Sequence, residues 1–262
     1  MEPLIGILVA LGFVIAGNVI EGGKLQSLLG GPAALIVLGG TLGAVIVQFP
    51  FSTLKGALNG AKAAMGKSKL NPQKVLDEIV DYANRARRDG ILALEKVAPG
   101  ASDPFLAKAL MMAIDGADSN TLRDTMEIAI SHQEEEGEDG AKVFEAAGGY
   151  TPTVGIIGAV LGLIHVMSNL SDINAVGEGI ASAFVATIYG VAAANILLLP
   201  FAGRIKMRVR DEVAVKTMML TGVLAIQEGM NPKLVRERLA EFVPHHGKKE
   251  RAGAAVPAKA AA

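Results

Sequence analysis

The residues of this sequence that could do chemistry in an apolar setting are few, and a threonine is the most prominent of them. Thr187 lies in the middle of a long uncharged run, with Ala183 and Gly190 beside it on the same helical face. A hydroxyl at such a position either bonds back to its own helix or is available to another polar partner. The spacing alone favours the bond to its own helix.

Patterns of catalytic and metal-binding residues are missing from the sequence. There is no P-loop, GxSxG or HExxH motif, no carboxylate pair in a plausible pocket and no cysteine. The histidines show no metal-ligand spacing except for the tail pair, which we expect to be solvated; they are His132, His165, His245 and His246. His165 falls inside an uncharged run, where a structural role is favoured over a proton relay. We therefore expect no enzyme activity, no metal and no cofactor.

The charged residues leave long gaps in which a membrane can be crossed. None occurs between Glu145 and Asp172, or between Glu178 and Arg204. About 20 apolar residues span a hydrocarbon core of roughly 30 Å, so each run can cross a bilayer once. Small residues on both runs suit close helix contacts: Gly155, Gly158, Ala159 and Gly162 on the first, and Ser182, Ala186, Gly190 and Ala194 on the second.

Two prolines mark this pair of runs. We predict that Pro152 begins the first helix, where its missing N–H is not needed. Pro200 lies near the end of the second, where it removes a backbone hydrogen bond inside an apolar helix. These uncharged runs contain no Asp, Glu, Lys or Arg. Where such ionisable residues do occur inside a membrane, they mark ion pathways. If this protein conducts ions, a partner must supply the titrating group.

The N-terminal part repeats the arrangement. Residues 3–20 are uncharged, and a second uncharged run begins at Pro32 after a short loop. The first run follows Glu2 and contains no Lys or Arg, so we interpret it as a retained helix and not as a cleavable signal peptide. The sequence thus predicts an all-α polytopic membrane protein with four transmembrane helices in two hairpins and a helical cytoplasmic domain.

Basic residues predict the orientation, because short cytoplasmic segments keep Lys and Arg. They follow the second and fourth spans, whereas the loops after the first and third contain a single one, Lys24. Both termini are then cytoplasmic. The predicted division is 1–51 for the first two transmembrane helices, 52–150 for the cytoplasmic helical domain, 151–203 for the third and fourth spans, 204–243 for cytoplasmic C-terminal helices and 244–262 for a disordered tail.

The segment 52–150 is predicted to form four soluble helices. Asn71-Pro72 begins the first, ILALEKVA forms the second and Asp103-Pro104 begins the third. The fourth runs from about Asn120 to Gly137, where HQEEEGEDG indicates a solvated helix end. After the fourth span the apolar spacing predicts one long helix that continues into the cytoplasm. The net charge of −1 gives no reason to expect nucleic acid binding.

Several motifs resemble those of the MotA/PomA family, the four-helix subunit of the bacterial flagellar stator. The third span opens with T-P-T-V-G-I-I-G-A-V-L-G from Thr151, and the fourth contains A-T-I-Y-G from Ala186. The insert carries R-R-D-G-I-L-A-L-E from Arg87, which is similar to the family's charged motif. The order of two hairpins with a long cytoplasmic insert is also the family's layout.

The resemblance implies a function and an assembly. The family forms a homopentamer around two single-span B subunits, which bind peptidoglycan and supply a transmembrane aspartate. The complex lies in the inner membrane and couples proton flow to torque on the rotor switch protein. Such a partner would provide the carboxylate that this chain lacks.

The resemblance also implies roles for single residues. Pro152 and Pro200 match prolines that couple ion flux to cytoplasmic movement, and Thr187 matches a threonine that lines the ion path. Arg87 and Glu95 match charges that face the rotor. The residue after G-I-I-G resembles a threonine in sodium-driven members; here it is Ala159, which offers no oxygen to Na⁺, so protons are favoured.

Two other classes of membrane protein remain open as alternatives. A TolQ/ExbB-like energiser subunit uses a related ring-and-partner plan, but the first apolar run and the R-R-D-G motif argue against a three-span chain of that kind. A passive membrane scaffold would cause no change in proton leak when it is expressed with any partner. A neighbouring gene for a peptidoglycan-binding, single-span protein would indicate a flagellar stator.

Overall fold

The computed structural model describes residues 2–66, 70–168 and 170–243, and within these ranges it contains helices and turns but no strand. Four helical stretches of the described residues are long and apolar enough to cross a membrane: Pro3–Ile20, Leu25–Gln48, Ser119–Ser168 and Ile173–Gln227. The prediction of an all-α chain with four membrane-spanning helices is confirmed. The predicted disordered tail, 244–262, lies outside the described residues.

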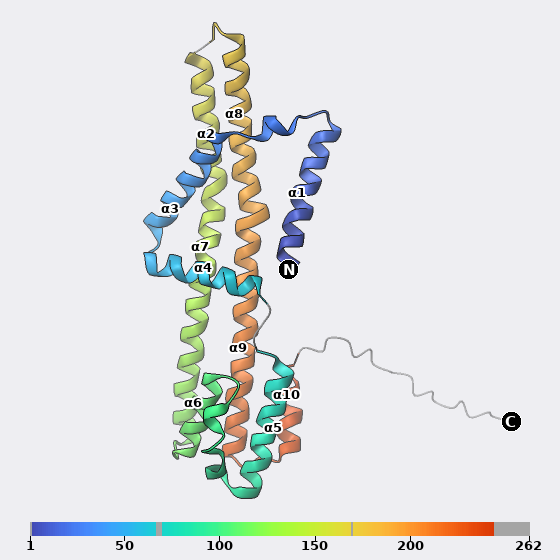
Figure 1. Cartoon of the computed structure of the whole chain (residues 1–262). Coiled ribbons are helices and arrows are strands. Elements are labelled where there is room, and N and C mark those ends of the chain that lie inside the picture. The colour runs from blue at the N-terminus through green and yellow to red at the C-terminus, as the bar shows by residue number, and fades with distance from the viewer. Residues whose placement is uncertain (1, 67–69, 169, 244–262) are drawn as a thin grey trace, which may run out of the picture. The chain divides into compact units, whose positions relative to one another are not determined.

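The chain forms two compact units (Figure 1). Among the described residues, the first unit contains 2–66, 70, 124–168 and 170–217, and the second contains 71–123 and 218–243. Two helices pass from one unit into the other: α7 (Ser119–Ser168) and α9 (Leu199–Gln227).

The first unit begins with α1 (Glu2–Ile20) and a 3-10 turn, η1 (Leu25–Leu28). The second span is one unbroken helical stretch made of α2 (Gly31–Ala34), the π-helical segment η2 (Leu35–Gly39) and α3 (Gly40–Gln48). It ends because Phe49 is extended, as residues before proline prefer to be. Pro50 then leads into α4 (Phe51–Met65), which crosses the long helices in Figure 1.

The third span does not begin at Pro152, and that prediction was wrong. Helix α7 runs without interruption from Ser119 to Ser168, so the expected helix end at Gly137 does not exist either. A proline inside a helix lacks one backbone hydrogen bond, and close packing in a helix bundle makes one such loss tolerable. The neighbouring Thr151 is fully buried, and its hydroxyl donates to the carbonyl oxygen of Ala147.

The fourth span continues as a single helix, as the sequence predicted. It consists of α8 (Ile173–Ala192), the π-helical segment η5 (Ala193–Leu198) and α9. Asp172 caps its first turn by accepting hydrogen bonds from the amides of Asn174 and Ala175. Tyr189 ties α8 to the loop before the second span, since its hydroxyl donates to the Leu28 carbonyl oxygen at 2.6 Å.

The second unit surrounds an apolar core with short helices. They are α5 (Pro72–Asp89), the 3-10 turns η3 (Ile91–Leu94) and η4 (Ala98–Gly100), α6 (Pro104–Ile114) and α10 (Pro232–Ala240). The predicted starts of α5 and α6 are correct, but ILALEKVA forms 3-10 and turn structure and not an α-helix. The Cβ position of Gly222 lies 2.5 Å from Cγ2 of Ile79 and 3.2 Å from Cδ1 of Leu239, so α9 packs closely against α5 and α10.

Candidate functional site

Helices α7 and α8 touch through a row of small residues. The Cβ position of Gly158 lies 2.8 Å from the Cβ of Ala186, and that of Gly162 lies 3.0 Å from the carbonyl oxygen of Gly179. Gly190 sits against Gly155 further along the row. The expected close contact is therefore present, and Gly179 and Ala183 take part in it although the small-residue spacing did not include them.

This row determines which side of the hairpin each neighbouring residue occupies. Each further residue turns about 100° round a helix, and in an antiparallel pair the residues that follow the contact positions point to the same side. Ala159 follows Gly158, and Thr187 follows Ala186. These two predicted site residues therefore lie on one side of the hairpin, at nearly the same depth.

The second span covers the other side of the hairpin. The Cβ position of Gly40 lies 2.7 Å from Cγ1 of Val154, and Val185 packs with Ala33 and Val37. Val154 and Val185 each precede a contact residue by one position, which turns them away from Ala159 and Thr187.

We call the side that carries Ala159 and Thr187 the open face. Its large residues are exposed, and Ala159 and Thr187 are half-buried. The large residues are Ile156 and Leu163 on α7, and Ile180 and Val191 on α8. Among the described residues, the open face carries no charged side chain, and the Thr187 hydroxyl is its chief polar group.

The Thr187 hydroxyl donates to the carbonyl oxygen of Ala183 at 3.2 Å. The bond to its own helix that the spacing favoured is therefore present. The oxygen still has lone pairs to accept another hydrogen bond, because the hydroxyl uses its single proton in this contact. The side chain can bond to its helix and also face a polar partner on the open face.

The two prolines lie in neighbouring parts of the hairpin. Pro152 has no N–H to donate to the Gly148 carbonyl, and Pro200, just after η5, has none to donate to the preceding π-helical turn. The Cβ position of Gly148 lies 2.6 Å from Cδ2 of Leu199. Both helices therefore lack one backbone hydrogen bond at the same level, although the prolines lie 48 positions apart in the sequence.

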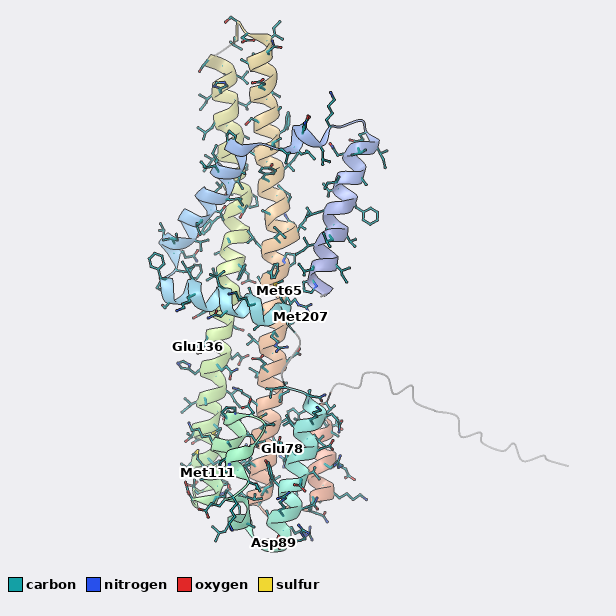
Figure 2. All side chains as sticks on the ribbon, viewed as in Figure 1. Met65, Glu78, Asp89, Met111, Glu136 and Met207 are labelled. Atoms are coloured by element: carbon teal, nitrogen blue, oxygen red, sulfur yellow. The ribbon has the colours of Figure 1, made fainter. Side chains whose placement is uncertain are left out.

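Arg87 and Glu95 belong to the second unit, on either side of the end of α5. Both are exposed, and neither makes an ion pair with any residue that the structure describes. Asp89, the last residue of α5, is exposed beside them (Figure 2), and Gly90 ends the helix with φ of +81°. The positive φ explains the glycine of R-R-D-G, and Arg87 and Glu95 on either side of it are exposed charges that no described residue pairs with.

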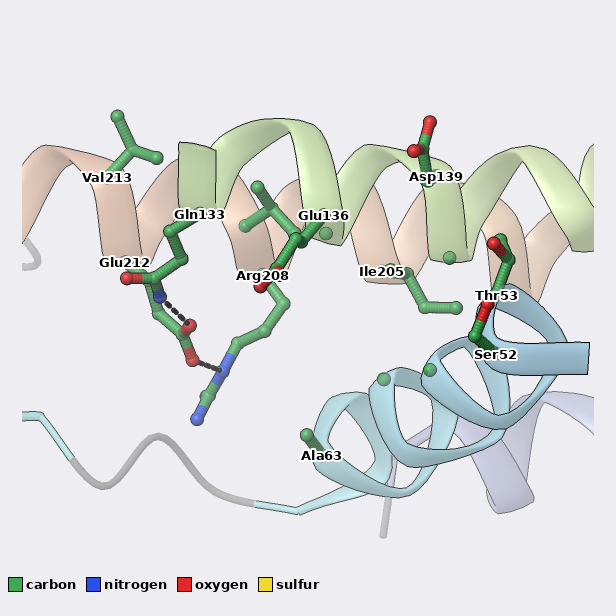
Figure 3. Close-up of a pocket in the computed structure, with 15 residues that line it drawn as sticks. Ser52, Thr53, Ala63, Gln133, Glu136, Asp139, Ile205, Arg208, Glu212 and Val213 are labelled. Atoms are coloured by element: carbon green, nitrogen blue, oxygen red, sulfur yellow. Dashed lines mark hydrogen bonds and ion pairs between the residues drawn. The ribbon is translucent and has the colours of Figure 1, made fainter. Parts of the chain in front are cut away.

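The acidic stretch of α7 is more than the solvated helix end that its sequence indicated. HQEEEGEDG is not a helix end; it forms one wall of a cavity of about 500 Å³ between α4, α7 and α9 (Figure 3). In this cavity Arg208 donates to Glu212 at 2.8 Å, and the Gln133 amide donates to the other oxygen of Glu212. Nearby, Lys206 pairs with Glu145 at 2.7 Å. The sequence did carry a signal for this pairing: α7 has a run of acidic residues, and the helix after Arg204 has a run of basic ones.

The fold is that of a polytopic membrane protein, and the chain belongs to the MotA/TolQ/ExbB proton channel family. Residues 97–218 match this family. Residues 4–89 match the N-terminal part of motility protein A.

Relatives along nearly the whole chain narrow this further. Motility protein A of Bacillus subtilis (strain 168) is 35% identical over 245 residues, which cover 92% of this chain and 90% of the relative. Chemotaxis protein PomA of Vibrio alginolyticus is 32% identical over 244 residues, covering 93% and 95%.

Solved structures agree with the fold. The structure of C. jejuni MotAB matches with a TM-score of 0.90 at 28% identity, covering 94% of this chain and 97% of that one. The flagellar MotAB stator complex from Bacillus subtilis matches with a TM-score of 0.86 at 34% identity, covering 92% and 95%.

Proposed function

We propose that this chain is the ring-forming A subunit of a bacterial flagellar stator, which couples proton flow across the inner membrane to torque on the rotor. The chain has the length, the four spans and the fold of the motility proteins that it matches. This role is mechanical and ion-linked, and it requires no catalysis by the chain.

The observation that carries the proposal is the open face. The chain's own second span does not cover this face, because it packs on the other side of the hairpin. The face is uncharged, and it presents the Thr187 hydroxyl beside Ala159. A face of this kind suits a partner helix that brings the single carboxylate needed to carry a proton, because charges inside a membrane are costly and functional. The expected partner is a single-span, peptidoglycan-binding B subunit, with five A subunits around two of them.

Each candidate residue has a proposed role. Thr187 and Ala159 line the ion path, and the lack of a hydroxyl at Ala159 favours protons over Na⁺. Pro152 and Pro200 let the hairpin bend when the ion passes. Arg87 and Glu95 meet the rotor switch protein, and their unpaired, exposed charges support this.

The proposed orientation follows from the basic residues after the second and fourth spans. Lys55 and Lys62 lie on α4, and Arg204, Lys206 and Arg208 lie on α9. Both termini and the second unit are then cytoplasmic.

The test is to express the chain with its genomic single-span neighbour and to measure rotation while the proton and sodium gradients are collapsed separately. Loss of rotation with the proton gradient supports the proposal. Rotation that depends on sodium alone would contradict the assignment from Ala159. Mass measurement of the co-purified complex checks the five-to-two assembly.

The second candidate is a TolQ/ExbB-like energiser of the same family. Its partner would lack a peptidoglycan-binding domain, and deletion of the gene would leave motility intact. The match of residues 4–89 to the N-terminal part of motility protein A favours the stator.

A further inference from the structure

Helix α4 carries a stripe of exposed apolar side chains. Phe51, Leu58 and Met65 are 75%, 62% and 38% exposed. Residues seven apart on an α-helix lie within about 20° of one another, so the three form one continuous stripe along the whole helix. Figure 2 shows Met65 at its far end.

A second face of α4 holds the helix on the bundle. Ala57 and Ala64 are 1% and 3% exposed, and the Cβ position of Gly140 on α7 lies 3.4 Å from the Cα of Ala57. Nε of Arg204 on α9 donates to the carbonyl oxygen of Ala64 at 2.8 Å. These contacts fix the rotation of α4 about its own axis.

A third face looks toward the charged parts of α7 and α9. Ser52, Gly56 and Ala63 line the cavity of about 500 Å³, whose other walls include Glu136 and Arg208 (Figure 3). This face of α4 therefore points to the charged side of the first unit.

Three consecutive residues show where the apolar stripe must point. Gly56 faces the charged cavity, and the next residue, Ala57, packs on α7. Each residue is rotated by about 100° from the one before, so Leu58 lies on the side of Ala57 that is away from the cavity. The stripe consequently points toward the uncharged halves of the long helices, where the hydrocarbon of the membrane lies. Lys55 and Lys62 are exposed about 40° from the stripe, on the side away from the bundle.

We propose that α4 lies in the membrane–water interface and binds acidic phospholipids. Phe51, Leu58 and Met65 enter the acyl region, and the lysines extend to the phosphates of anionic headgroups. The assignment to the cytoplasmic leaflet rests on the orientation given with the proposed function. Because Arg204 joins the end of α4 to α9 four residues after Pro200, lipid binding also fixes the level at which α9 leaves the membrane.

Tryptophan fluorescence tests the position of the stripe, since the sequence contains no tryptophan of its own. The full-length Leu58→Trp variant is reconstituted in phosphatidylcholine vesicles with or without bromine on the acyl chains. We expect brominated lipid to quench this tryptophan. Ala63→Trp, on the cavity face of the same helix, is the matched control and should keep its fluorescence. If Leu58→Trp does not fold, Phe51→Trp reports on the same stripe.

Headgroup binding is tested by replacing brominated phosphatidylcholine with brominated phosphatidylglycerol. A lysine at a membrane surface contributes about fivefold in affinity for anionic lipid, so the anionic lipid should quench Leu58→Trp at lower mole fraction. Adding Lys55→Gln and Lys62→Gln should remove this preference, whereas Lys74→Gln and Lys96→Gln in the second unit should leave it.

Two results would overturn the inference. An unquenched Leu58→Trp and Phe51→Trp would mean that a second copy of the chain or water covers the stripe. Equal quenching by both lipids would exclude the headgroup contact. Neither result bears on ion flux or rotation, so the lipid site and the stator function fail separately.

Discussion

The Cβ position of Gly190 lies 3.1 Å from the Cα of Gly155 and 2.9 Å from the carbonyl oxygen of Thr151. The backbones of α7 and α8 are therefore in direct contact at this point, just beside Pro152. In a membrane this packing replaces the hydrophobic driving force that lipid cannot supply.

The first prediction concerns this contact. Gly190→Ala adds a methyl group against backbone atoms that cannot rotate away, so we expect a loss of about 1–3 kcal/mol in hairpin packing. Gly177→Ala, on the same helix, has open space around its Cβ position and should be neutral. The amount of complex that survives solubilisation in detergent should fall for Gly190→Ala and not for Gly177→Ala. Equal yields of both would show that the contact is dispensable.

Thr187→Val tests the polar feature of the open face. It keeps the side-chain shape and removes the hydroxyl, at a cost to stability of about 1 kcal/mol or less. We expect proton flux and torque to fall together while the amount of complex stays constant. Ser182→Ala is the control, because Ser182 precedes Ala183 by one position and so lies on the opposite side of the row. Unchanged flux in Thr187→Val would remove Thr187 from the ion path.

Pro200→Ala restores an N–H that can donate to a carbonyl of the preceding turn, η5. We expect the complex to be at least as abundant as the wild type, with torque reduced more than proton flux. The physical reason is that a stiffer helix moves less for each ion that passes. Leu197→Ala, which keeps the proline, is the control. Wild-type torque per ion in Pro200→Ala would refute a coupling role.

Arg87→Glu reverses an exposed charge that has no partner among the described residues. Exposed charges contribute about 0–1 kcal/mol to stability, so assembly should be unaffected. We expect swimming to be impaired, most clearly under high load. Lys74→Glu makes the same change at the other end of α5 and should be tolerated. Normal speed for Arg87→Glu would argue against the rotor contact.

Tyr82 gives the second unit a pH dependence. Burial and the 2.8 Å hydrogen bond from its hydroxyl to Glu78 raise the pKa of Tyr82 above its ordinary value. The unfolded chain therefore loses this proton at lower pH than the folded one. Stability from Tyr82 is complete below about pH 10 and falls as the pH rises further. Denaturation at increasing pH should show this loss in the wild type and less of it in Tyr82→Phe.

Local sequence rules predicted the four spans and most helix starts, because charge gaps and Asn-Pro or Asp-Pro caps act over a few residues. They failed at α7, where Gly137 and Pro152 looked like an end and a start. At Pro152 the helix packs directly on α8, where the Cβ position of Gly190 lies 3.2 Å from the Cα of Pro152, and this contact depends on another helix. That Ala159 and Thr187 lie on the same side of the hairpin could likewise not be predicted, because it depends on which glycines of α7 and α8 touch.

The alignment of Gly148 with Leu199 has a mechanical consequence. Both long helices lack a backbone hydrogen bond at that level, and each such bond contributes about 1 kcal/mol net. One elementary charge that moves through 100 mV releases about 2.3 kcal/mol, which is the same order as both missing bonds together. We therefore expect the hairpin to bend most easily at this level, at a cost of the same order as the work available from a single ion.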